Sequence, residues 1–77
     1  MDPEVIGAEL RRMLRLYAAA PKKHRDIYLG MALGLKQALD LSGEGRYARL
    51  VIDEGVADLG RGLGSNRGAR RVIDMLF

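Results

Sequence analysis

The chain contains no cysteine, no tryptophan and no threonine, and only four of its 77 residues are aromatic. Without cysteine, it can form neither a disulfide nor a thiolate metal site. Its core must therefore be built mainly from aliphatic side chains. Leucine and alanine are abundant and β-branched residues are few, a composition that favours helix over strand. The expected fold class is all-α: a small helical bundle of three main helices plus a short C-terminal helix.

Long hydrophobic runs are also missing. No run reaches the roughly 18 apolar residues that span a bilayer, and the first residues, Met1 to Glu4, are acidic rather than basic as in a signal peptide. We therefore expect a cytoplasmic chain with no membrane partner. A chain this short buries only about 60 % of the surface that its unfolded form exposes. With no disulfide available, we expect a single domain, residues 1–77, that gains support by homo-oligomerisation.

Residues for catalysis and metal binding are scarce. His24 is the only histidine and lies in a basic run, which indicates a surface position. The adjacent acids Asp53 and Glu54 diverge by about 100° on a helix, so they cannot face each other as a catalytic pair. We expect no enzymatic activity, no metal, no cofactor and no small-molecule substrate.

Start and stop signals divide the chain into helices over about 3–20, 22–41, 44–59 and 67–76. Asp2 can cap the first helix, and Pro3 suits its first turn. Pro21 disfavours helix in the residue before it. Gly43 is suited to a left-handed cap after the second helix. Four glycines between residues 60 and 68 predict a flexible loop over 60–66.

The second helix contains nine consecutive uncharged residues, 27–35. At 100° per residue, a wide apolar face is predicted to pack on the core: Ile27, Tyr28, Met31, Ala32, Leu35 and Leu39. Gly30, Gly34 and Ala38 form a ridge of small residues on that face. The ridge either packs against the first helix or forms a self-association face.

Leu29 and Leu33 fall among the charged residues of the same helix. We expect them to point away from the core, toward a partner. The predicted protein-interaction residues are Leu29, Leu33, Gly30 and Gly34.

Charge is segregated along the sequence. Two segments, residues 11–25 and 61–71, contain basic residues and no acid, whereas residues 26–60 contain six acids and three basic residues. The basic side chains of the two segments are Arg11, Arg12, Arg15, Lys22, Lys23, Arg25, Arg61, Arg67, Arg70 and Arg71. They form either a solvated surface or a phosphate-binding one.

Two function classes follow. The first is a small non-enzymatic protein-interaction module, a regulator or inhibitor that docks on a larger protein and self-associates. The alternative is a nucleic-acid-binding protein that uses the basic segments. In size, and in a Tyr28-x-Gly30 segment followed by an aliphatic helix, the chain resembles helical accessory proteins of phages and mobile elements. That resemblance lies in composition and carries over no residue's role.

Overall fold

The structure is a computed structural model that describes residues 2–63 and 66–77, with the backbone alone for residues 59–63 and 66–69. Four α-helices follow one another: α1 (Pro3–Ala19), α2 (Arg25–Leu41), α3 (Gly45–Leu63) and α4 (Asn66–Leu76). A single 3₁₀ turn, η1 (Lys22–His24), precedes α2. The all-α prediction is thus confirmed for the described residues, which include no strand. None of the described helices has both the length and the apolar character needed to cross a membrane.

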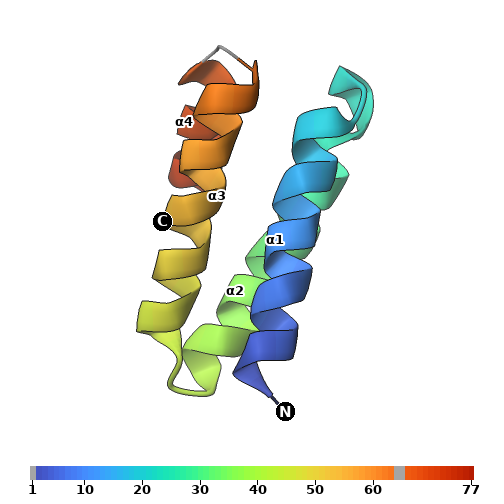
Figure 1. Ribbon diagram of the computed structural model, residues 1–77. Coiled ribbons are helices and arrows are strands. Elements are labelled where there is room, and N and C mark those ends of the chain that lie inside the picture. The colour runs from blue at the N-terminus through green and yellow to red at the C-terminus, as the bar shows by residue number, and fades with distance from the viewer. Residues whose placement is uncertain (1, 64–65) are drawn as a thin grey trace.

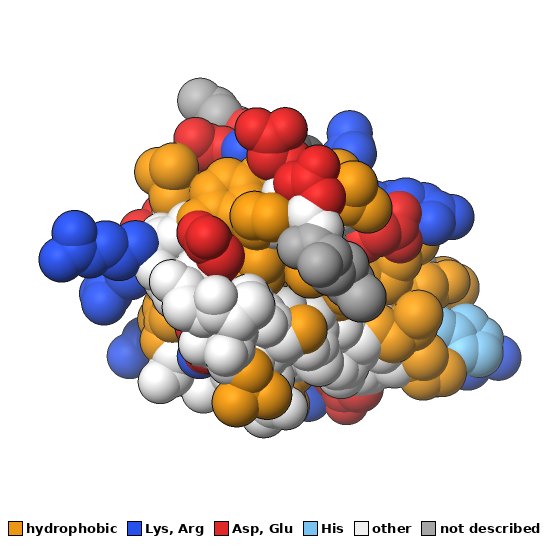
Figure 2. Space-filling view, turned by 90° about the horizontal axis from the view of Figure 1, so that it is seen from below, with side chains coloured by type: hydrophobic (Ala, Val, Ile, Leu, Met, Phe, Trp, Pro, Cys, Tyr) orange, Lys and Arg blue, Asp and Glu red, His pale blue; other side chains and the backbone are white. Residues whose placement is uncertain are grey.

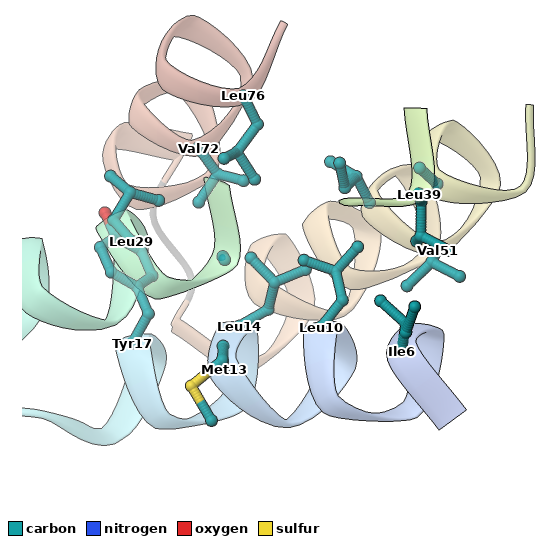
Figure 3. Close-up of a cluster of buried hydrophobic side chains, with 13 residues drawn as sticks. Ile6, Leu10, Met13, Leu14, Tyr17, Leu29, Leu39, Val51, Val72 and Leu76 are labelled. Carbon is teal, nitrogen blue, oxygen red and sulfur yellow. The ribbon is translucent and has the colours of Figure 1, made fainter. Parts of the chain in front are cut away.

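The helices form two antiparallel pairs that lie side by side (Figure 1). α1 pairs with α2, and α3 pairs with α4. α1 also packs against α3, and α2 packs against both α3 and α4. The hydrophobic core lies between the pairs, with side chains from all four helices converging on it (Figure 3).

Local signals at the helix ends act as the sequence predicts. The Asp2 side chain accepts a hydrogen bond of 2.9 Å from the backbone N–H of Glu4, and Pro3 occupies the first turn. After α2, Gly43 adopts a φ of +85°, which glycine reaches without a steric penalty. The N–H of Glu44 then donates to the Leu39 carbonyl at 2.8 Å, which closes a Schellman cap.

The prediction of a loop over residues 60–66 is wrong for its first four residues. α3 continues through Gly60 and Gly62 to Leu63, four residues past the predicted end of the helix. Each glycine costs a helix about 1 kcal/mol relative to alanine. Extension of a helix that already exists avoids the cost of nucleation, so it tolerates that penalty. Residues 64 and 65 of the predicted loop lie outside the described residues, and its last residue, Asn66, is the first residue of α4.

Side chains from α1, α2, α3 and α4 form one buried cluster. The buried hydrophobic side chains of the described chain are Ile6, Leu10, Met13, Leu14, Tyr17, Leu29, Ala32, Leu39, Ala48, Val51, Ile52, Val72 and Leu76. No polar or charged side chain is buried among the described residues. The cluster is therefore a mainly aliphatic core that includes one aromatic side chain, Tyr17.

Two glycines allow α1 and α3 to approach closely. A methyl carbon built on Gly7 would lie 2.6 Å from the Tyr47 hydroxyl oxygen, and one built on Gly55 would lie 2.5 Å from Leu14 Cδ1. Both distances are well below van der Waals contact, so a side chain at either position would require Tyr47 or Leu14 to move.

Candidate interaction surface on the second helix

α2 presents the core with a different face from the one predicted. Leu29 is fully buried, and Figure 3 shows it beside Tyr17 within the core cluster. Leu33 is half-buried and also packs on that cluster. The prediction that these two leucines point away from the core is therefore wrong.

The opposite face of α2 is apolar as well, and it is exposed. We define the α2 outer face by six residues: Ile27, Gly30, Met31, Gly34, Ala38 and Leu41. Ile27 is 59 % exposed, Met31 is 51 % exposed and Leu41 is 89 % exposed. At 3.6 residues per turn, the six residues fall within about 100° of the helix circumference. The prediction that Ile27 and Met31 belong to the core is wrong.

Gly30 and Gly34 lie in open space. A methyl carbon built on either one meets no atom within 4 Å. They therefore do not pack against α1, in contrast to Gly7 and Gly55, each of which leaves room for a side chain of a neighbouring helix. Within the single chain, Gly30 and Gly34 cost helix stability and gain no packing contact in return.

Charged residues border the core face of α2, and their position explains why the sequence predicts the wrong orientation for this helix. Asp26 accepts two hydrogen bonds from Arg71 of α4, at 2.7 and 3.1 Å. Lys36 pairs with Asp40 at 3.0 Å, and Lys36 is half-buried. Long side chains of this kind cover apolar surface with their aliphatic parts while their charges reach water. The charged sector therefore lies beside the core instead of opposite it.

The α2 outer face contains no charged residue, and its large side chains have surface to bury. Complete burial of an aliphatic side chain contributes about 1.5–3 kcal/mol. Scaled by the exposed fractions of Ile27, Met31 and Leu41, covering this face would contribute roughly 3–6 kcal/mol. This gain is large enough to support an interface, provided that the partner fits closely.

Hydrophobic side chains also reach the surface elsewhere. Figure 2 views the molecule from the end at which the chain begins, and it shows exposed hydrophobic side chains with Lys and Arg projecting at the rim. Leu50 on α3 is 53 % exposed, almost the same fraction as Met31. Single exposed residues of this kind are ordinary. The α2 outer face differs because its apolar residues follow one helix for about 21 Å.

Four of the predicted basic residues make contacts within the chain. Arg11 pairs with Glu54 at 2.7 Å, and Arg12 pairs with Glu9 at 3.4 Å. Arg71 pairs with Asp26. Arg25 donates to the Ala20 carbonyl at 3.3 Å, and its guanidinium carbon lies 6.0 Å from the centre of the Tyr17 ring.

The other basic residues fall into two groups. Arg15, Lys22, Lys23 and Arg70 are exposed, whereas the side chains of Arg61 and Arg67 lie outside the described residues. The pair between Arg71 and Asp26 joins the middle of α4 to the start of α2. Parts of both basic segments, Lys22–Arg25 and Arg70–Arg71, are thereby brought to the same end of the bundle (Figure 1).

Compared with protein-family models, with curated proteins and with solved structures, the chain has no match in any of the three. Among the described residues, no three His, Asp or Glu side chains lie close enough together to hold a metal ion. The α2 outer face and the basic end of the bundle are the two candidate functional surfaces of the described residues.

Proposed function

We propose that this chain is a small non-enzymatic protein-interaction module, a regulator or inhibitor that docks on a larger protein through the α2 outer face. A single observation carries the proposal: α2 is apolar on two opposite sides, and the bundle covers only one of them. The core side is buried at Leu29, Ala32 and Leu39, whereas the outer side exposes Ile27, Met31 and Leu41. An exposed apolar strip on so small a protein is typical of a binding surface.

The experiment compares two substitutions of equal chemistry at positions of equal exposure. Met31→Glu places a charge on the α2 outer face, and Leu50→Glu places one on α3 as the matched control. Each tagged variant is used for affinity capture from cells that express it, and bound proteins are quantified by mass spectrometry. We expect a partner recovered with the unsubstituted chain and with Leu50→Glu to be lost with Met31→Glu. Recovery of the same proteins with Met31→Glu would refute docking through this face.

The second candidate function is nucleic-acid binding. The observation in its favour is that Lys22, Lys23 and Arg70 are exposed at the end of the bundle where α2 and α4 both begin. Clustered cations attract the phosphate backbone without regard to base sequence. Against it, Arg11, Arg12 and Arg71 are already paired with carboxylates.

A salt titration tests this second candidate. For a protein that contacts Z phosphates on duplex DNA, log K falls with log salt at a slope of about −0.9Z. Replacement of Lys22, Lys23 and Arg70 by Ala should flatten that slope. Arg12→Ala is the control, since its cation is already paired with Glu9. No binding to DNA or RNA at low salt would eliminate this candidate.

A further inference from the structure

We propose that a second copy of this chain covers the α2 outer face, forming an antiparallel pair with its twofold axis at Gly34. This inference rests on the proposed function, because it names a partner for the same surface. It also predicts a regulatory consequence. Dimerisation and docking on a larger protein would use the same residues, so each would exclude the other.

The ends of the α2 outer face are placed symmetrically about Gly34. Ile27 lies seven residues before Gly34 and Leu41 lies seven after it, while Gly30 and Ala38 lie four residues to either side. A twofold interface joins the same patch of both copies, so the patch must complement itself. A half-turn at Gly34 places Ile27 of one copy opposite Leu41 of the other. Ile27 and Leu41 then meet at both ends of the contact and the two Gly34 residues meet at its centre, with Met31 of each copy near Gln37 of the other.

The residues of the α2 outer face are spaced as in the seam between two paired helices. Ile27, Met31, Gly34, Ala38 and Leu41 follow one another at intervals of four and three residues in turn. This alternation produces a straight apolar seam between two helices that cross at about 20°. At such an angle the two helices stay in contact along the whole seam. The distance between Ile27 and Leu41 of the second copy therefore remains short.

Gly30 and Gly34 leave free space on the α2 outer face. Nothing in the single chain occupies the space where their side chains would lie. Closest approach of two helices depends on the size of the residues at the contact. With glycine at the axis, the two α2 backbones can approach closely at Gly34, and Met31 of each copy fills the space beside that contact. The face thereby gains the packing contact that the single chain does not supply.

Charge at the start of α2 disfavours a parallel arrangement. Exposed Lys22 and Lys23 precede the helix, whereas at its other end Asp40 is paired with Lys36 and Glu44 is followed by the exposed Arg46. An antiparallel copy places the basic start of each α2 beside the end of the other, where these four charges cancel. A parallel copy would place Lys22 and Lys23 of both copies together, which is unfavourable. The antiparallel arrangement therefore has the weaker charge repulsion.

The absence of cysteine allows a direct test by cross-linking. Three single variants are prepared: Ile27→Cys, Leu41→Cys, and Leu50→Cys as a control on α3. Each is oxidised alone and in pairwise mixture, and covalent dimers are counted on a non-reducing gel. A disulfide requires the two Cα atoms to lie within about 7 Å. We expect the mixture of Ile27→Cys with Leu41→Cys to link much faster than either variant alone.

Two results would overturn the proposal. If the mixture links no faster than Leu50→Cys alone, the α2 outer faces do not meet. If Ile27→Cys and Leu41→Cys each link to themselves faster than they link to each other, the pair is parallel. Sedimentation velocity provides the second measurement. Gly34→Leu should shift the unsubstituted chain's dimer to monomer while its helicity is kept, and Asp53→Leu on α3 should leave the dimer intact.

The dimer and the proposed function can fail separately. A purified chain that stays monomeric at every concentration refutes the second copy. If Met31→Glu still loses a captured partner in that case, docking through the α2 outer face stands. If the chain dimerises as proposed and Met31→Glu loses no captured protein, docking on a larger protein fails and the dimer stands. One helix against its copy buries less than the roughly 1,200 Å² of a standard interface, so we expect micromolar dissociation.

Discussion

Gly34→Ala should stabilise the single chain, although it adds a side chain to what looks like a packing ridge. The added methyl group meets no atom within 4 Å, so it introduces no clash. Alanine is more favourable than glycine inside a helix by about 0.8–1.0 kcal/mol. The free energy of unfolding should therefore rise by about 1 kcal/mol, and the Tm by about 4–8 °C for a domain of this size.

Urea denaturation followed by far-UV circular dichroism measures this change, at a dilution where the chain is monomeric. Gly7→Ala is the matched control, because its methyl group would lie 2.6–2.9 Å from ring and hydroxyl atoms of Tyr47. Relief of this clash requires the Tyr47 side chain to move, at a cost that offsets the gain in helix propensity. We therefore expect Gly34→Ala to be the more stabilising of the two substitutions. A loss of stability in Gly34→Ala would show that Gly34 faces a neighbouring helix, which would refute the orientation of α2.

Three further substitutions test the fold by the same denaturation assay. Leu29→Ala should lower the free energy of unfolding by about 2–5 kcal/mol, since the side chain is fully buried; a change within error would place Leu29 at the surface. Gly43→Ala should lower it by about 1–2 kcal/mol because φ is +85°, and an increase would contradict that turn. Asp26→Asn removes an exposed ion pair with Arg71 and should cost less than about 1 kcal/mol, an effect that high salt should abolish. A large, salt-independent loss would mean that the pair is shielded from water.

The first helix could be predicted well from the sequence, because its two sides differ clearly. Apolar residues recur at helical spacing on one side, arginines occupy the other, and Asp2 with Pro3 marks the start. A single orientation then buries the apolar side, and the structure buries Leu10 and Leu14 as expected. The turn at Gly43 could be predicted for a similar reason, since only one local conformation suits glycine there.

The orientation of α2 could not be predicted, because the helix is apolar on two sides. A helical wheel places residues around an axis and does not say which side its neighbours cover. Of the two interpretations of the small ridge at Gly30 and Gly34, packing against the first helix is wrong, because the ridge supplies almost no volume to fill a core and lies in open space. The bundle instead buries Leu29 and Leu39, whose larger side chains fill the space between the helices. The charged residues that border this side favour the opposite prediction, a side that points away from the core. In the structure they form ion pairs at its edges.

The candidate interaction residues were only partly predictable. Gly30 and Gly34 were identified from their spacing, whereas Ile27, Met31 and Leu41 were not assigned to an interface. Their alternation at four and three residues was visible in the sequence. The alternation indicates an interface only if this side of α2 is exposed. That exposure is set by the packing of all four helices.

Methionine oxidation at two protein concentrations tests most directly whether the α2 outer face is open in the single chain and covered by a partner copy. Met31 and Met75 are exposed to similar extents, 51 % and 46 %, whereas Met13 is buried at 4 %. Oxidation by peroxide is read at each methionine by mass spectrometry of peptides. At high dilution, Met31 should oxidise about as fast as Met75; at high concentration, Met31 alone should become protected. If Met31 oxidises as slowly as Met13 at high dilution, the α2 outer face is not open in the single chain. If its rate does not depend on protein concentration, no second copy covers that face.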